Sequence, residues 1–220
     1  PEGVATDSAG NVYVADAGNG AIRMISPTGI VNTLATGISS PLGIAVDSSG
    51  NRYVAAGGDG TVRKFTPVGV VSLLAGSPGQ YGSDDGRGNA ARFNTPFNVA
   101  VDAAGNVYVT DLFNDTIRRV APDGMVNTIA GAVRTPGSLD GPGKDARFNH
   151  PWGIATDAAG NVFVSENANN TVRKIAIVVP TAAPAIVPAL SARSLIALAM
   201  LLGVAAAIAL RPSRTLANVR

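Results

Sequence analysis

The sequence has no cysteine and a single histidine, His150. The absence of cysteine excludes both a disulfide framework and a thiolate metal site. A metal site needs three or four converging ligands, and a nucleophile–His–Asp triad needs a histidine of its own. We therefore predict no metal and no cofactor, and we interpret His150 as an exposed loop residue. These absences favour a non-catalytic protein.

Charge is also scarce, and it is unevenly distributed. Only 15% of the residues are charged, and residues 177–220 contain four arginines and no acid. Residues 1–176 keep 13 basic and 15 acidic residues, so the high isoelectric point of 9.3 comes from the tail. A weakly acidic body lacks the basic surface that nucleic-acid binding requires. Nucleic acid is therefore not an expected partner.

Glycine and proline are abundant, with 26 and 14 residues, and they mark a recurring turn. The pattern Asp-x-x-Gly-Asn occurs at Asp7, Asp47, Asp102 and Asp157, at spacings of 40, 55 and 55 residues. Its glycine supplies the left-handed backbone position that a tight turn requires. Self-similarity at such a period is typical of solenoids, arrays and propellers.

Each repeat predicts four short antiparallel strands. In the second repeat these are residues 43–47, 51–55, 61–65 and 70–75, separated by glycine-containing turns. Four strands in about 40 residues are typical of a β-propeller blade, whose two apolar faces must be covered by neighbouring blades. No helical stripe of apolar residues occurs before residue 190. The predicted fold is all-β, a propeller of four-stranded blades, followed by a C-terminal hydrophobic helix.

The repeated string is Pro-x-(Gly/Asn)-(Ile/Val)-Ala-x-Asp-x-x-Gly-Asn-x-(Tyr/Phe)-Val, followed by Asn-x-x-(Ile/Val)-Arg-(Lys/Arg) in the third and fourth copies and by close variants of it in the first two. It resembles the NHL repeat of bacterial propeller proteins, which implies a ring usually of six blades. Asn98 replaces the usual glycine, and in the second repeat Ala56 and Asp59 replace the acid and the asparagine. Residues 1–176 then contain about four blades, with repeats near 1–40, 41–95, 96–150 and 151–176.

The resemblance implies that the four blades are a fragment of the ring. We expect about two further blades and an export signal upstream of Pro1. The fourth repeat lacks the sequence pattern of a fourth strand. We expect this strand to come either from the upstream part of the protein or from residues 177–179.

Two insertions, 85–96 and 140–151, precede the third and fourth repeats and share the pattern Asp-Gly-x-Gly-x-x-Ala-Arg-Phe-Asn-x-Pro. We expect Phe93 and Phe148 to fill gaps between blades. Trp152 follows a repeat-initial proline, as Leu42 and Phe97 do, and is expected to pack.

The C-terminal region differs from the repeats. Residues 177–193 form a Pro/Ala linker, and 194–214 are predicted to be a transmembrane or sorting helix with a basic end. Residues 194–210 would enter the membrane. As a helix, the 16 mostly apolar residues 195–210 would be about 24 Å long. The arginines would then be cytoplasmic. The alternative is a helix buried against the propeller.

A short motif precedes this segment: Val187, Pro188, Ala189, Leu190 and Ser191. With the apolar segment and the arginines it resembles IPTL-type sorting signals, relatives of the PEP-CTERM signals. The resemblance implies an exosortase-like sorting enzyme as a partner. Ala189 stands where the signature has threonine, and the usual Glu-Trp-Gly is absent.

Acids and asparagines recur where the second strand of a repeat ends. The candidate ligand-binding residues are Asp16, Asn19, Asp111, Asn114, Glu166 and Asn169. Arginines recur on the third strand and could pair with these acids: Arg23, Arg63, Arg118 and Arg173. Such residues can serve the turn of each blade, or they can form a polar ring at one end of the propeller, where this architecture binds ligands.

We predict an exported, envelope-associated propeller that acts as a binding or scaffold module for a protein or surface polymer. The propeller would be periplasmic or extracellular in a bacterial cell envelope. One alternative is a lyase or hydrolase whose catalytic ligands lie in the missing N-terminal blades. Another is a purely structural surface protein.

Overall fold

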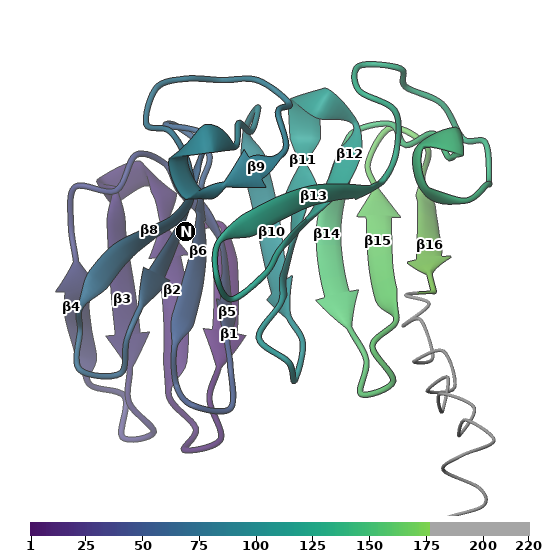
Figure 1. Ribbon diagram of the computed structural model, residues 1–220. Coiled ribbons are helices and arrows are strands. Elements are labelled where there is room, and N and C mark those ends of the chain that lie inside the picture. Colours follow the sequence, from purple (N-terminus) through teal and green to yellow (C-terminus); the bar gives the residue numbers. More distant parts are fainter. Residues whose placement is uncertain (177–220) are drawn as a thin grey trace, which may run out of the picture. The chain divides into compact units, whose positions relative to one another are not determined.

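A computed structural model of the protein describes residues 1–176, which form four antiparallel sheets, one for each repeat (Figure 1). The predicted linker, sorting motif and apolar segment (177–220) lie outside the described residues. Within 1–176, no helix is long and apolar enough to cross a membrane. The prediction of four blades built from short antiparallel strands is confirmed.

The four sheets are named blades 1 to 4 in chain order. Blade 1 contains β1 (Gly3–Thr6), β2 (Val12–Asp16), β3 (Ala21–Ile25) and β4 (Val31–Ala35). Blade 2 contains β5 (Pro41–Val46), β6 (Arg52–Ala56), β7 (Thr61–Phe65) and β8 (Val71–Gly76). Blade 3 contains β10 (Pro96–Val101), β11 (Val107–Asp111), β12 (Thr116–Val120) and β13 (Met125–Ala130), with the short β9 (Gly86–Arg87) added at its outer edge. Blade 4 contains β14 (Pro151–Thr156), β15 (Val162–Glu166) and β16 (Thr171–Ile175).

The recurring Asp-x-x-Gly-Asn pattern forms the turn between the first two strands of every blade. In blade 1, one carboxylate oxygen of Asp7 accepts hydrogen bonds from the backbone N–H groups of Ala9 and Asn11. The other accepts from the Asn11 amide at 2.8 Å and from the Tyr13 hydroxyl at 2.9 Å. Gly10 has the positive φ (82°) that the turn requires. These contacts explain why the aspartate, glycine and asparagine recur together.

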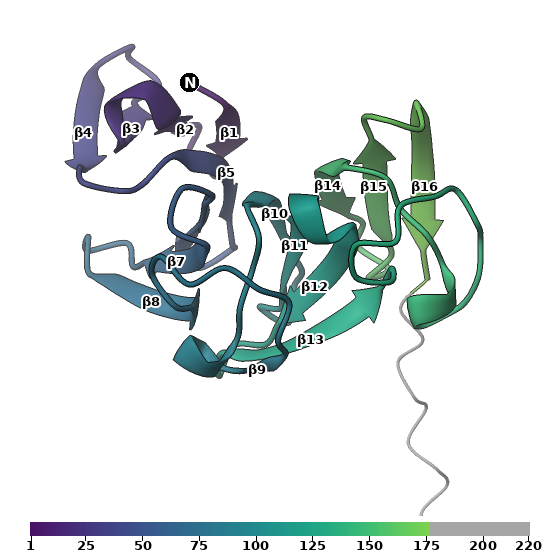
Figure 2. The same cartoon turned by 90° about the horizontal axis from the view of Figure 1, so that it is seen from above.

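The blades are held together by apolar side chains that pack face to face. Tyr13 and Ile22 of blade 1 are buried with Val54 and Phe65 of blade 2. The residues equivalent to Tyr13 and Ile22 are buried in the same way: Tyr53 and Val62 of blade 2 pack against blade 3, and Tyr108 and Ile117 of blade 3 pack against blade 4. Seen from above, the sheets follow one another in an arc with their first strands on the inner side (Figure 2). Each blade therefore covers a face that its neighbour could not bury alone.

Neighbouring first strands approach so closely that the repeat needs a glycine there. A Cβ atom added to Gly43 on β5 would lie 2.6 Å from the Asn98 Cα on β10. A Cβ atom added to Gly3 on β1 would lie 2.4 Å from the Leu42 carbonyl oxygen. Such distances are below van der Waals contact, so the glycine of the Pro-x-Gly pattern is required by packing. Asn98, the one departure, lies against Gly43 and so occupies space that Gly43 leaves free.

The two insertions lie at the end of the blades where the second strands finish. They contain the 3-10 helices η2 (Gly88–Ala90) and η4 (Gly143–Asp145), and they form the upper loops in Figure 1. Phe93 is buried between blades 2 and 3, and Phe148 between blades 3 and 4. The prediction that these phenylalanines fill gaps between blades is confirmed.

Both terminal blades have a face that no described residue covers. Val172 on β16 is 74% exposed, whereas Val62 and Ile117, its equivalents in blades 2 and 3, are fully buried. On the other side Val4 is exposed, whereas the equivalent Ile44 and Val99 are buried. Blade 4 has no fourth strand within residues 1–176.

Candidate functional site

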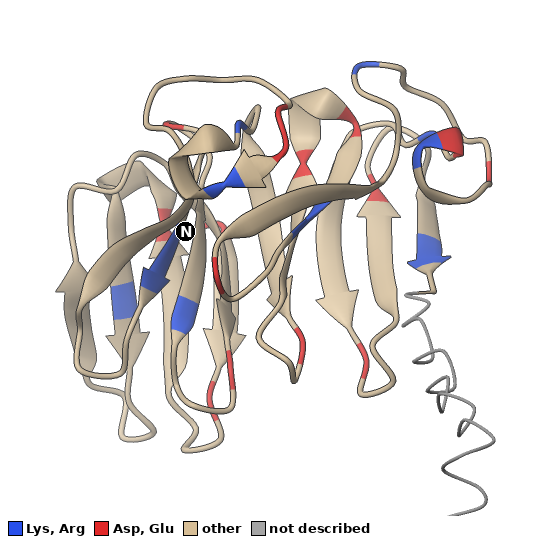
Figure 3. Cartoon of the chain, viewed as in Figure 1, with Lys and Arg blue, Asp and Glu red and all other residues tan. Residues whose placement is uncertain are grey.

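The six candidate residues lie at the same end of their blades as the insertions. Asp16, Asp111 and Glu166 are the last residues of β2, β11 and β15. The asparagines follow in the short connections to the third strands, in blades 1 and 3 within η1 (Ala17–Asn19) and η3 (Leu112–Asn114). Acidic residues also occupy the hairpin turns at the opposite end (Figure 3).

Each acid is bonded to the asparagine and to the arginine of its own blade. Asn19 donates to Asp16 at 2.9 Å, and Asn114 and Asn169 donate to Asp111 and Glu166 at 2.7 Å. The ion pairs that the sequence suggested are Arg23–Asp16 at 2.7 Å, Arg118–Asp111 at 2.8 Å and Arg173–Glu166 at 3.5 Å. The structure therefore brings the six residues together as three separate pairs, one in each of three blades.

The second blade keeps the ion pair although it lacks the acid at the end of β6. Asp59, which stands at the asparagine position, pairs with Arg63 at 2.6 Å and accepts a hydrogen bond from Thr61 at 2.6 Å. The carboxylate has thus moved by three residues along the chain and still reaches the same arginine. The constant feature of the four blades is a charge partner for the third-strand arginine.

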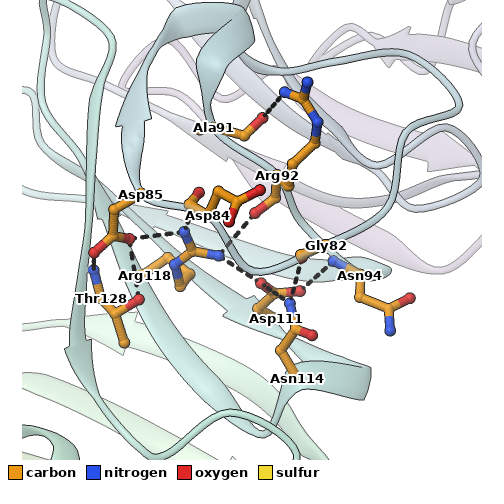
Figure 4. Close-up of polar contacts among 10 residues, drawn as sticks. All are labelled: Gly82, Asp84, Asp85, Ala91, Arg92, Asn94, Asp111, Asn114, Arg118 and Thr128. Carbon is orange, nitrogen blue, oxygen red and sulfur yellow. Dashed lines mark hydrogen bonds and ion pairs between the residues drawn. The ribbon is translucent and has the colours of Figure 1, made fainter.

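In blade 3 the arginine also binds the insertion (Figure 4). The fully buried Arg118 guanidinium donates to Asp111 and to Asp85 at 2.8 Å, and to the carbonyl oxygens of Asp84 and Arg92 at 2.9 Å. Asp85 in turn accepts hydrogen bonds from the Thr128 backbone N–H at 3.1 Å and hydroxyl at 3.0 Å. Arg118 thereby fixes the path of the insertion over blade 3.

The Asp111 carboxylate is surrounded by donors of the protein itself. Besides Arg118 and Asn114 it accepts the Asn94 backbone N–H at 2.7 Å. Burial raises the pKa of the Asp111 carboxyl, and the positive charge of Arg118 opposes this rise. Because Asp111 and Asn114 are fully buried, their partners are groups of blade 3 and of the connection between blades 2 and 3, including the Gly82 carbonyl oxygen. A direct role for the six residues in ligand binding stays a prediction.

Blade 4 repeats this construction. Glu166 accepts the Asn149 backbone N–H at 2.8 Å, and Arg173 binds Asp140 at 2.6 Å and the carbonyl oxygens of Leu139 and Arg147. The Arg173 guanidinium lies 4.5 Å from the centroid of the Phe148 ring, as Arg118 lies 5.0 Å from that of Phe93. Each insertion is therefore held by one arginine and one phenylalanine.

The segment that enters each first strand contains a feature that the sequence analysis missed. Ser40, Thr95 and His150 each have a positive φ, of 46°, 59° and 53°, although none is glycine and each precedes a proline. Such a conformation is strained and persists only where surrounding contacts impose it. The equal spacing of these three residues in the sequence is the signal that could have found it.

Two residues further along, Leu42, Phe97 and Trp152 occupy equivalent positions. Trp152 stacks on Phe97 with ring centroids 4.0 Å apart and yet remains 41% exposed, so packing accounts for only part of its surface. His150 is exposed, as predicted, and its ring meets Phe113 edge-on at 6.1 Å. Phe113 itself is 51% exposed.

The described part of the chain has one further candidate site, a pocket, and no metal-binding cluster. No group of three histidine or acidic side chains is placed there to hold a metal ion. A pocket of about 210 Å³ lies between the hairpin turns of blades 2 and 3, at the end opposite the insertions. Its lining includes Asp47 and Asp102, whose carboxylates are bonded within their own turns.

Small antiparallel sheets packed face to face around an axis define the protein as a β-propeller. A family model described as "NHL repeat" matches residues 1–23 and 148–175, which contain β1, β2 and part of β3 in blade 1 and all three described strands of blade 4. A chloroplast protein of Arabidopsis thaliana named SUPPRESSOR OF QUENCHING 1 is 32% identical over 97 residues, which cover 44% of this chain and 9% of that protein.

Two solved structures from Bacteroides thetaiotaomicron are similar over most of the blades. One, a protein of unknown function, is 29% identical with a TM-score of 0.70 and covers 78% of this chain and 46% of its own. The other, an auxiliary nutrient binding protein, is 25% identical with a TM-score of 0.68, and the shares are 79% and 47%. The chain thus spans about half the length of these structures. Together the comparisons support an NHL-repeat propeller.

Proposed function

We propose that the protein is a binding module: an exported, envelope-associated propeller that presents a rigid surface to a protein or surface polymer. The single observation behind this proposal is the way the insertions are held. An arginine and a buried phenylalanine fix each insertion to its blade: Arg118 is fully buried and the side chain of Arg173 is 13% exposed. Tyr81 and Leu139, which precede the insertions in the same connections between blades, remain exposed. A stiff scaffold with exposed loop side chains is suited to recognition because little entropy is lost on binding.

The similarity to an auxiliary nutrient binding protein supports a binding role. The envelope location rests on the apolar segment 194–210 and its basic end, which lie outside the described residues. Sorting through Val187–Ser191 by an exosortase-like enzyme belongs to the same proposal. The propeller would then be released or attached at the envelope surface.

Binding is tested by incubating the full chain with bacterial envelope material from which membrane lipid has been extracted, so that the apolar segment 194–210 cannot insert, and measuring the fraction that sediments with it. A variant with Tyr81→Ser and Leu139→Ser is expected to bind several-fold more weakly. The matched control is Val68→Ser, which changes a more exposed apolar side chain in the turn between β7 and β8, at the opposite end of blade 2. Equal sedimentation of both variants would contradict recognition through the insertions, and no sedimentation of the unchanged chain would contradict the function.

The location is tested by fractionating cells that express the chain with and without residues 190–220. We expect the complete chain in the membrane fraction, with the propeller accessible to protease from outside the inner membrane. The same soluble location for both chains would contradict the anchor.

A further inference from the structure

We propose that four aromatic side chains at the end of blades 3 and 4 form a carbohydrate-binding site for a neutral sugar ring. This aromatic cluster consists of Phe97, Phe113, His150 and Trp152. The inference rests on the proposed binding function and names the chemistry that the surface recognises.

The cluster consists of two ring pairs, each of which crosses the boundary between blades 3 and 4. Phe97 at the start of β10 stacks on Trp152 at the start of β14 with ring centroids 4.0 Å apart and an interplanar angle of 45°. Phe113 in η3 meets His150 at 6.1 Å and 90°. His150 and Trp152 are separated only by Pro151. The four rings are therefore joined by two ring contacts and one short piece of backbone.

The repeats show that the blade fold does not require these rings. At the position of Phe113 the other three blades have Gly18, Gly58 and Ala168. At the position of Trp152, blade 2 has Leu42, and at the position of His150 the other blades have Ser40 and Thr95. These small or aliphatic residues support the same strands and turns. Large, partly exposed aromatic side chains at these positions therefore need an explanation other than packing.

The backbone beneath the cluster is held from both blades. The Asn149 N–H is bound by Glu166 at 2.8 Å and the His150 N–H by Asp115 at 3.0 Å. The His150 carbonyl accepts the Asn167 N–H at 3.1 Å, and the Trp152 carbonyl accepts the Thr110 hydroxyl at 3.1 Å. These bonds impose the strained backbone of His150 and fix the rings before a ligand arrives. In this way Glu166, one of the predicted site residues, positions the segment without needing to touch the ligand.

The polar groups beside the rings suit hydroxyl groups. His150 Nδ1 is bonded to Asn149 Oδ1 at 2.8 Å, so the histidine Nε2 and the asparagine amide nitrogen are the remaining polar atoms of this pair. With Nδ1 as the donor, Nε2 accepts a hydrogen bond and the amide nitrogen donates one. A sugar hydroxyl can do both.

The aromatic rings can bind the apolar C–H face of a sugar. A pyranose presents a face of C–H bonds with partial positive charge, and the face of an aromatic ring carries partial negative charge. The nearby carboxylates of Asp115 and Glu166 are buried and bonded to backbone N–H groups. The exposed part of the cluster therefore favours a neutral saccharide over an ionic ligand.

Trp152 is the only tryptophan of the chain, so its fluorescence reports on this site alone. The full chain would be titrated with soluble oligosaccharides of glucose, xylose and N-acetylglucosamine. We expect at least one of them to change the Trp152 emission saturably with a Kd of about 1 mM or lower. The absence of any change with all of them would overturn the proposal.

Variants taken from the repeat itself avoid confusing lost binding with lost folding. Trp152→Leu, His150→Thr and Phe113→Ala introduce residues that equivalent positions already hold. Each is expected to weaken saccharide binding, measured by calorimetry, by at least about fivefold, with an unchanged circular dichroism spectrum. Val68→Ser serves as the control that leaves binding unchanged, and wild-type affinity in the triple variant would overturn the site.

The envelope sedimentation experiment separates this inference from the proposed function. If the unchanged chain and the triple variant sediment equally with envelope material, the saccharide site fails and the binding function stands. If the triple variant loses capture of a protein but no saccharide binds, the cluster is a protein contact and the inference also fails. If nothing sediments, the proposed function itself fails.

Discussion

A charged side chain that water cannot reach is stable only if other groups replace the water. Arg118 and Asp111 are both fully buried, and they meet this requirement through each other, through Asp85 and through backbone groups of the insertion. Removing one member of such a pair leaves the other charge without compensation, which costs more than the pair itself contributes. The arginine is therefore the residue on which blade 3 and its insertion depend most.

We expect Arg118→Met to lower the free energy of unfolding by about 3–5 kcal/mol, because Asp111 would remain buried without its counter-charge. The measurement is urea denaturation followed by circular dichroism. Arg87→Met is the matched control, since Arg87 and Asp123 form an exposed ion pair at 2.7 Å, and its loss is expected to cost at most about 1 kcal/mol. Similar losses for the two variants would contradict the role given to Arg118.

The aspartates of the hairpin turns make stability depend on pH. The Asn11 amide, with further hydrogen bonds, holds the pKa of Asp7 below its usual value, and the Asn161 amide does the same for Asp157. A group whose pKa is lowered in the folded state stabilises the fold above its unfolded pKa of about 3.9 and loses this effect as pH falls through the folded value.

We therefore expect the urea midpoint to fall as the pH is lowered below about 4. The urea midpoint of the Asp157→Asn variant should fall less steeply with pH, because asparagine cannot be protonated in this range. Glu2→Gln, an exposed residue outside the turns, is the control and should follow the wild-type curve. A variant curve with the wild-type slope would show that Asp157 does not contribute.

At the level of strands and loops, the insertions behave as parts of the core rather than as surface loops. Phe93 lies among apolar residues of blades 2 and 3, and Phe148 among those of blades 3 and 4. Each insertion also supplies acceptors for a third-strand arginine: Asp85 and Arg92 for Arg118, and Asp140 and Arg147 for Arg173. The 55-residue spacing of the later repeats thus reflects an added piece of the interface between blades.

Phe93→Ala should lower the free energy of unfolding by about 3–5 kcal/mol, because it leaves a cavity between two blades. Phe113→Ala changes a half-exposed phenylalanine at the same end and should alter stability by no more than about 0.5 kcal/mol. Thermal and urea unfolding of both variants would decide. If Phe93→Ala lowered the free energy of unfolding as little as Phe113→Ala, the insertion would not be part of the core.

For the propeller as a whole, the question is what lies beside the outer blades. Val62 and Val172 hold equivalent places on the third strands of blades 2 and 4, but only Val62 is covered by a following blade. Substitutions at these two residues therefore test whether the outer face of each blade is covered in solution.

In the 220-residue chain we expect Val62→Asp to destabilise blade 2 by at least about 4 kcal/mol, since it buries an unpaired charge. Val172→Asp should change the stability by less than about 1 kcal/mol, because water reaches the site. Proteolysis and urea unfolding measure both effects. Equal and severe destabilisation would show that another surface covers blade 4.

Much of this architecture could be predicted from single residues and their spacing. The four recurring aspartates placed the hairpins, and the alternation of apolar residues placed the strands, because both depend on contacts within a few residues of each other. The pairing of Arg23, Arg118 and Arg173 with the acids was also predictable, since adjacent strands in one blade bring them together. Even the buried phenylalanines of the insertions followed from the repeat.

The sequence alone determined the number of repeats, the strands in each and the ion pairs within each blade, because these are set by local turns and by neighbouring strands. Only the tertiary structure decided which polar groups are buried and which rings are exposed. Asp111 loses its water because an insertion from the preceding repeat covers it, and Trp152 keeps part of its surface because Phe97 of the neighbouring blade covers only one side. Both outcomes depend on groups more than 15 residues away, which local spacing does not specify.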